Sequence, residues 1–235
     1  MRLDLHTHTV YSKHAFWGRD ALNTPEQMVR SARKHGLNGM AITDHQTVKG
    51  GIVGRAWARK NMKDFLVVPG TEIRTVTGDI LALGVEEDVP DGLSVVETVE
   101  QIHALGGIAI GAHPFASFIF RRAVGNLARY ADAIEVFNAS TCLNYRANKQ
   151  ALELALRTKK PGTASSDAHV ARDVGRAGII LQNDAATVDD VLAAIRKGRF
   201  DTFGKYTPIY DLAYLTLTKF SRAVVYKMLG KHGPR

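Results

Sequence analysis

The stretch Leu3-Asp4-Leu5-His6-Thr7-His8, near the start of this 235-residue chain, decides how the rest is interpreted. Apolar and polar residues alternate along it, which is the period-two pattern of a strand with two unlike faces. His6 and His8 therefore point to the same side, at the carboxyl end of that strand. Two imidazoles placed in this way can hold one metal ion, although so short a motif is equally compatible with a pair of surface histidines.

Further apolar runs along the chain also end in strong polar groups. Residues 39–43 lead into Asp44-His45, 65–70 into Thr71-Glu72, 108–112 into His113-Pro114, 133–137 into Asn138, and 162–166 into Asp167-Ala168-His169. Strand and helix patterns alternate throughout, which predicts parallel strand–helix units. In barrels built from such units the active site lies at the carboxyl ends of the strands. The sequence therefore predicts one polar site assembled from several strand ends.

Helix start signals support this alternation. Thr24-Pro25-Glu26-Gln27 predicts a helix with Thr24 as N-cap and Gln27 closing a capping box, ending at Gly36. Ser94 is expected to cap another helix, which runs to about Leu105. Further helices are expected at 50–62, 144–158 and 187–197, and further strands at 79–84 and 178–181.

Composition limits the possibilities without choosing a function. The chain has 45% hydrophobic and 23% charged residues, as a folded domain does, and a formal charge of +8, which favours anionic ligands. Cys142 is the single cysteine, so a metal would have to be held by His, Asp and Glu. The first strand begins at the amino terminus and no run reaches transmembrane length, so we expect a cytoplasmic protein without stable membrane insertion.

Together, the motifs DLHTH, TDH, PGTEI, a His-Pro after a strand, EVFN and SSDAH resemble the PHP (polymerase and histidinol phosphatase) family, in its short stand-alone phosphoesterase type. The resemblance runs from Met1 to about Gly175. It implies an α/β fold, a distorted (β/α)7-type barrel with its metal site at the carboxyl strand ends. It also implies two or three divalent ions (Zn, Mn or Fe) and hydrolysis of phosphoesters.

The resemblance also implies a ligand set, namely His6, His8, His14, His45, Glu72, Asp79, His113, Asp167 and His169. His6, His8, Glu72 and Asp167 would hold one ion. Glu72 would bridge to a second ion served by His113, and His14, His45 and His169 would hold a third. Asp79 stands where three-metal members often carry His, and a carboxylate there shifts the preference towards Mn or Mg.

The expected mechanism is in-line attack on phosphorus by a metal-bridging hydroxide. Asp44 and Asp79 are the candidate catalytic residues, as proton donors to the leaving group, although a metal-bound water could serve, and Asp44 could instead orient a ligand imidazole. The candidate substrate-binding residues are Arg172, Arg176 and Arg19, since a guanidinium suits phosphate oxygens, and Asn138, which could hydrogen-bond either the substrate or the loop backbone. Arg19 could equally be a solvated surface group. Glu135 could be a ligand, an orienting group or half of a salt bridge.

Residues 1–205 are expected to form the barrel domain, and residues 206–235 a basic amphipathic helix packed on it. The preferred substrate is a small phosphorylated metabolite or nucleotide. One alternative is a nuclease or oligonucleotide exophosphoesterase, suggested by the positive charge and by the loop aromatics Phe16 and Trp17. The other is a non-catalytic, metal-stabilised binding module whose terminal helix docks on a partner or membrane. The sequence leaves the oligomeric state open.

Overall fold

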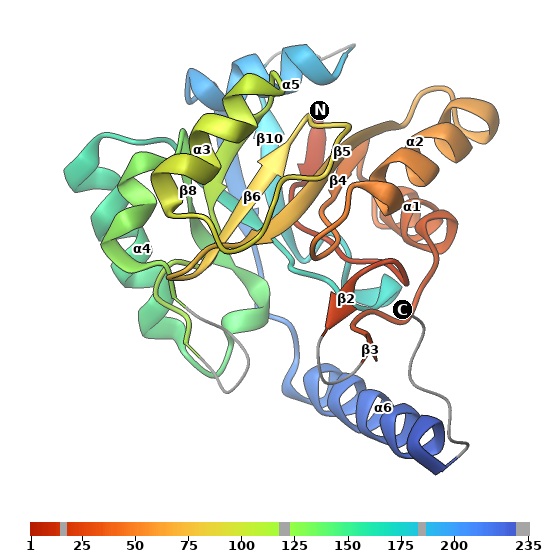
Figure 1. Ribbon diagram of the computed structural model, residues 1–235. Helices are drawn as coiled ribbons and strands as arrows, with labels where there is room; N and C mark the ends of the chain where they lie inside the picture. Colours follow the sequence, from red (N-terminus) through yellow and green to blue (C-terminus); the bar gives the residue numbers. More distant parts are fainter. Residues whose placement is uncertain (15–17, 118–122, 183–186, 229–235) are drawn as a thin grey trace.

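The computed structural model describes residues 1–14, 18–117, 123–182 and 187–228, with residues 14, 18, 19, 222, 223 and 225–228 described by their backbone alone. Within these ranges one large sheet has the order β11-β10-β1-β4-β5-β6-β7-β8-β9 (Figure 1). Its strands are β1 (Arg2–Asp4), β4 (Gly39–Ile42), β5 (Leu66–Arg74), β6 (Asp79–Leu83), β7 (Ile108–Gly111), β8 (Ala133–Asn138), β9 (Gly162–Ser165), β10 (Ala177–Leu181) and β11 (Phe200–Gly204). A separate hairpin pairs β2 (Lys13–His14) with β3 (Gly18–Arg19). The helices are α1 (Pro25–Lys34), α2 (Lys49–Asn61), α3 (Val95–Ala104), α4 (Tyr145–Thr158), α5 (Val188–Arg196) and α6 (Ile209–Met228).

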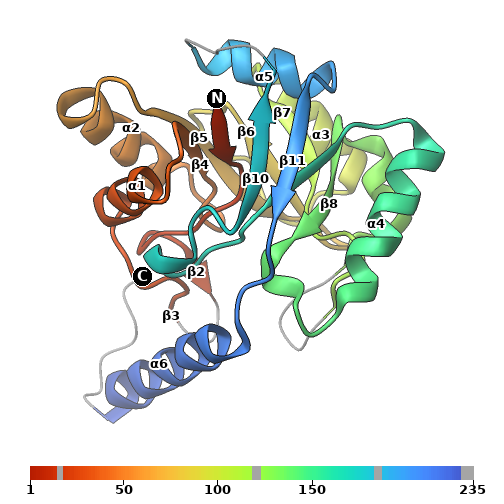
Figure 2. The same ribbon diagram turned by 180° about the vertical axis from the view of Figure 1, so that it is seen from behind.

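The sheet curls into an almost closed barrel, because β9 at one end comes close to β10 and β11 at the other (Figure 2). The α/β barrel class expected from the sequence is therefore confirmed, but the expectation of parallel units throughout was wrong. β6 runs antiparallel to both β5 and β7, and β10 runs antiparallel to β1 and β11. β11 and the β2–β3 hairpin were not predicted.

The reversal of β6 has a local cause. Only four residues separate β5 from β6, too few for the helix that a parallel connection needs. Thr75 closes this turn, since its backbone N–H donates to Gly78 O at 2.9 Å and its hydroxyl donates to the same oxygen at 2.7 Å. Because β6 runs backwards, its first residue, Asp79, lies opposite Arg74 at the edge where the forward strands end.

The barrel interior is filled by alternating apolar side chains from the strands, including Leu3, Val68 and Ile110. Helix α5 contributes to the same cluster through Val191, Leu192 and Ile195, and Figure 1 places it over the amino-terminal end of β1. Helices α1 and α2 pack against one side of the sheet, and α3 and α4 against another (Figure 1). The helix caps predicted at Thr24 and Ser94 are both present, and each forms a capping box, with Gln27 and with Glu97.

Helix α6 lies at the opposite end of the barrel from α5 (Figures 1 and 2). Asp211, on its first turn, is buried and accepts a bond from Arg172 Nε at 2.6 Å and one from Arg176 Nη2 at 3.3 Å. Further along α6, Lys219 Nζ pairs with Asp20 of the barrel. No helix in the described part of the chain is long and apolar enough to cross a membrane.

Candidate metal centre

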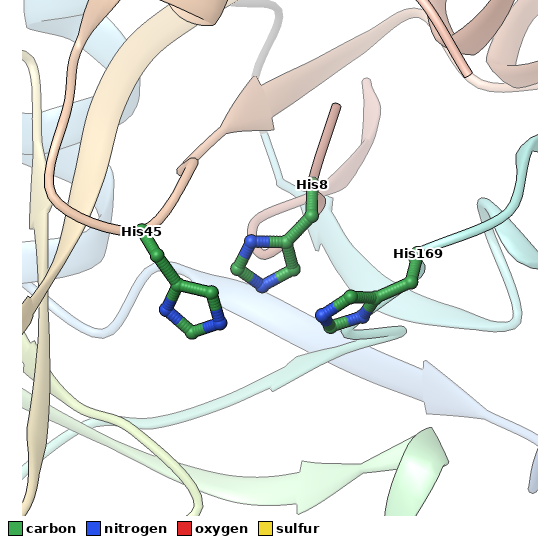
Figure 3. Close-up of side chains that lie close together, drawn as sticks. All are labelled: His8, His45 and His169. Carbon is green, nitrogen blue, oxygen red and sulfur yellow. The ribbon is translucent and has the colours of Figure 1, made fainter. Parts of the chain in front are cut away.

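Imidazoles and carboxylates from several strand ends converge inside the end of the barrel that faces α6. His6 and His8 follow β1, His45 follows β4, Glu72 lies in β5, His113 follows β7, and Asp167 and His169 follow β9. Figure 3 shows His8, His45 and His169 approaching one another from three separate segments. Two of these side chains, His45 and His169, are slightly exposed. The others are almost completely buried: His6, His8, Glu72, His113 and Asp167.

Glu72 is at the centre of this cluster. Its Oε2 lies 3.2 Å from His6 Nε2, 3.3 Å from His8 Nε2 and 3.1 Å from His45 Nδ1. Its other oxygen, Oε1, lies 3.0 Å from His113 Nε2. The two oxygens of one carboxylate thus face different imidazoles.

Asp167 completes the arrangement on the other side of His6 and His8. Its Oδ1 lies 3.2 Å from His8 Nε2 and 3.5 Å from His6 Nε2, while the two Nε2 atoms are 3.0 Å apart. Among the residues that the structure describes, three groups have ligand atoms within 4.8 Å of one another: His6, Glu72 and His113; His6, His8 and Asp167; and His8, His45 and His169. Nitrogen and oxygen donors of this kind suit Zn, Mn or Fe, so the residues present fit a divalent cluster.

His14 and Asp79, also expected as ligands, are not placed in these groups. The side chain of His14 lies outside what the structure describes. Asp79 is buried and lines a cavity that lies between the cluster and α6, but its Oδ1 accepts a bond from Arg74 Nε at 3.1 Å. Ligation by either residue stays a prediction.

Asp20 is a site residue that the sequence reasoning missed. Its Oδ2 lies 3.1 Å from His45 Nε2 and 2.9 Å from His169 Nε2, and its Oδ1 pairs with Lys219. Burial opposes ionisation of Asp20, but His169 and Lys219 outweigh it and hold the pKa of this carboxyl well below its usual range. Asp20 follows His14 in the same loop region and does not come after an apolar run, so no sequence pattern marked it as a site residue.

Glu135 orients His6. It is buried, its Oε1 accepts bonds from His6 Nδ1 at 3.1 Å and from Ser165 Oγ, and its Oε2 accepts from the His113 N–H at 2.6 Å and from Asn138 Nδ2 at 2.9 Å. When His6 is neutral and its Nδ1 donates to Glu135, its Nε2 carries a lone pair directed at the cluster. Of the three roles left open for Glu135, the contacts favour the orienting one.

Asn138 and Asp44 are likewise engaged with the protein. Asn138 donates to Glu135 and, at 3.3 Å, to Asp167 Oδ2, while its Oδ1 accepts from Ser140. Asp44 is fully buried, and both of its oxygens accept bonds from Thr9, from the backbone N–H and from the hydroxyl. Burial, only partly offset by Thr9, raises the Asp44 pKa to about 7. Neither side chain borders the cavity in front of the cluster.

The cationic groups at the cavity differ from those expected. Arg172 and Arg176 pair with Asp211 on α6 and are not among the residues that line the cavity, and the side chain of Arg19 lies outside the described part. Arg74 and Lys219 do line it. Their proximity to the cluster arises from long-range packing, which no local motif records.

The cluster imposes opposite pKa shifts on neighbouring imidazoles. Burial by itself would lower the pKa of His6, but Asp167, Glu72 and Glu135 raise it well above its usual value. Burial, reinforced by His169 and His45, lowers the pKa of His8 well below its usual value. So many coupled charges in a buried space are typical of a functional site.

The backbone is also strained at two of these residues. His113 has φ of 27° and Asp167 has φ of 53°, in the left-handed region that residues with a side chain rarely adopt. Each such residue costs roughly 1–3 kcal/mol and persists where the surroundings over-determine it. Strained backbone at two of the converging side chains is typical of a functional site rather than a passive core.

Comparisons with known proteins identify relatives of this chain. A family model described as PHP-associated matches residues 145–200. The uncharacterized protein MJ1587 of Methanocaldococcus jannaschii is 40% identical over 147 residues, which are 59% of this chain and 82% of that protein. A probable phosphatase of Caldicellulosiruptor bescii is 25% identical over 216 residues, covering 76% of this chain and 84% of that one.

Among solved structures, a two-domain protein from Bacteroides vulgatus containing a predicted PHP-like metal-dependent phosphoesterase superposes with a TM-score of 0.66. Its sequence is 17% identical, and the match covers 87% of this chain and 64% of that one. At this identity the likeness concerns the fold alone. Taken with the sequence relatives, these matches show that the chain belongs to the PHP family.

Proposed function

We propose that this PHP-family chain is a metal-dependent phosphoesterase that hydrolyses a small phosphorylated metabolite or nucleotide. The observation that carries the proposal is Glu72, whose Oε2 faces His6, His8 and His45 while its Oε1 faces His113. Bound divalent ions would supply Lewis-acid stabilisation of phosphoryl oxygens and a nucleophile at neutral pH. The residues proposed to hold two or three such ions are His6, His8, Glu72, His113, Asp167, His45, His169 and Asp20.

The other residues of the chain would prepare this site. Glu135 fixes the tautomer of His6, and Asn138 holds both Glu135 and Asp167 in place. Arg74 and Lys219 border the cavity and are proposed to bind the substrate phosphate, in place of Arg172 and Arg176, which Asp211 engages. Asp79, held by Arg74, remains the candidate proton donor that reaches the cavity.

The test is release of phosphate or nitrophenol from a panel of phosphomonoesters and phosphodiesters, with Mn²⁺ and Zn²⁺ supplied separately. We expect turnover of at least one phosphoester and its loss in the His6→Ala/His8→Ala double variant. The matched control is His103→Ala, because His103 lies on α3, is 45% exposed and pairs only with Asp132 among the contacts described.

An oligonucleotide in the same panel separates the nuclease alternative. Cleavage of the oligonucleotide without turnover of any small ester would replace the proposed substrate class. Absence of turnover on every substrate, with metal bound at full occupancy, would overturn the phosphoesterase and leave the metal-stabilised binding module.

A further inference from the structure

Helix α6 forms the roof of a cavity whose floor is the candidate metal centre. The cavity has a volume of about 730 Å³, within the range of small-molecule sites. Its floor consists of charged and polar groups, among them Glu72, His113 and Asp167. Its roof is mostly apolar and consists of α6 residues, including Leu212, Leu215 and Leu217.

The two surfaces differ too much in polarity for a ligand that is polar throughout. Leu212 and Leu215 lie seven and four residues before Lys219, so the three side chains share one face of α6. Along the chain this face carries two leucines and then a cation. That face extends about 10 Å along the helix axis from Lys219 to Leu212. Lys219 is held beside the cluster by Asp20, which fixes the direction of this gradient: charged near the metal centre, apolar further along α6.

Apolar side chains also remain exposed at the rim of the same cavity. Leu143 is 66% exposed, Ile209 63% and Leu217 69%, and all three line the cavity. Large apolar side chains gathered around one opening are a feature of binding sites rather than of ordinary surface. A ligand with an apolar body would remove them from water.

We propose that the substrate is a phosphomonoester of an apolar alcohol, with its phosphate at the metal centre and Lys219 and its alkyl or aryl body against α6. This inference rests on the proposed phosphoesterase function and narrows its substrate class. The cavity volume of about 730 Å³ suits a whole small ester. A lipid phosphate presented by a membrane shares the same chemistry, and the experiment separates the two sources.

The test uses non-hydrolysable alkylphosphonates from methyl to octyl, titrated calorimetrically into the full-length, Mn²⁺-loaded protein. Burial of each methylene against the leucines tightens binding, and we expect Kd to fall about two- to fourfold per added methylene. In Leu215→Gln and Leu212→Gln this dependence flattens, while the affinity for methylphosphonate stays unchanged. Leu156→Gln is the matched control, because Leu156 is 71% exposed on α4 and does not line the cavity.

A Kd independent of chain length in the wild-type protein would overturn the inference, even if either leucine variant failed to fold. The same dependence in the leucine variants as in the wild type would overturn it as well. Hydrolysis of polar phosphomonoesters alongside a flat phosphonate series would leave the phosphoesterase standing while this inference fails. Binding to phosphatidylcholine vesicles that contain phosphatidic acid, without binding to dissolved hexylphosphonate, would assign the apolar body to a membrane lipid and overturn the proposed free ester.

Discussion

Replacing Glu135 by Gln tests how the chain prepares His6. Four donors surround the Glu135 carboxylate: His6 Nδ1 and the Ser165 hydroxyl at Oε1, and the His113 N–H and Asn138 Nδ2 at Oε2. The amide NH₂ of Gln must face one of these pairs. It cannot face the Oε2 pair, because a backbone N–H has no acceptor form and Asn138 Oδ1 is already held by Ser140.

The NH₂ group therefore faces Ser165 and His6, where the hydroxyl can rotate and the imidazole can change tautomer. His6 Nδ1 then accepts a bond and the proton moves to Nε2, the atom proposed to bind metal. Loss of charge-assisted hydrogen bonds should lower the stability of the metal-free protein by about 1–3 kcal/mol. The protonated Nε2 should weaken metal binding by about 10- to 100-fold, as loss of such orienting partners does.

Urea unfolding of the chelator-treated variant gives the first quantity, and competition with a chromophoric chelator for Mn²⁺ or Zn²⁺ gives the second. Glu153→Gln is the control, since that side chain is 63% exposed on α4. Metal affinity equal to that of the wild type in Glu135→Gln would refute the tautomer argument. A variant that does not fold would refute the rotation of Ser165 and His6 that the argument requires.

Three further predictions concern the surroundings of the site. Gly50→Ala should lower the free energy of unfolding by about 1–3 kcal/mol in urea, because an added Cβ would overlap the Asp44 carboxylate; unchanged stability would show that Asp44 moves freely. Burial, together with the nearby Asp211 carboxylate, raises the pKa of Asp173 to about 6. The ionised form of Asp173 therefore destabilises the fold above that pH, and this destabilisation fades as the pH falls towards 4. Asp173→Asn should therefore raise the free energy of unfolding at pH 7 by ~1 kcal/mol, after a discount for screening by nearby solvent, and leave it unchanged at pH 4; an equal gain at both pH values would contradict this. Chelation should lower Tm, since metal at a hundred times its Kd adds about 2.7 kcal/mol, and a His6→Ala/His8→Ala variant with the same chelator shift as the wild type would show that the ions bind elsewhere.

The sequence predicted that several of these residues converge, because they lie at or near the ends of strands with a clear periodic pattern. His6, His8, Glu72 and Asp167 each sit at or just beyond an apolar run, and the carboxyl ends of neighbouring parallel strands meet at one edge. Local signals also located the helices, as the capping boxes at Thr24 and Ser94 illustrate.

What the sequence did not provide depends on contacts between distant residues. Asp20 lies in a loop without periodicity and reaches His45 and His169 only through the folded chain. Arg172 and Arg176 follow the Asp167-Ala168-His169 motif, which made them candidates for phosphate binding. Asp211, about 35 residues further on, draws both to α6 instead. A guanidinium pairs with whichever carboxylate the tertiary structure brings near, and local sequence does not specify that partner.

The anchoring of α6 links these two findings. Asp211 is buried, and an unpaired carboxylate there would destabilise the fold. That cost is larger in magnitude than the stabilisation that an exposed ion pair usually provides. Arg172 and Arg176 remove that penalty at the start of the helix, and Asp20 holds Lys219 further along. With both points fixed, Leu212 and Leu215, which lie between them in sequence, are held over the metal centre. The arginines expected to bind substrate directly are thus inferred to contribute indirectly, by fixing the apolar roof under which the substrate would lie.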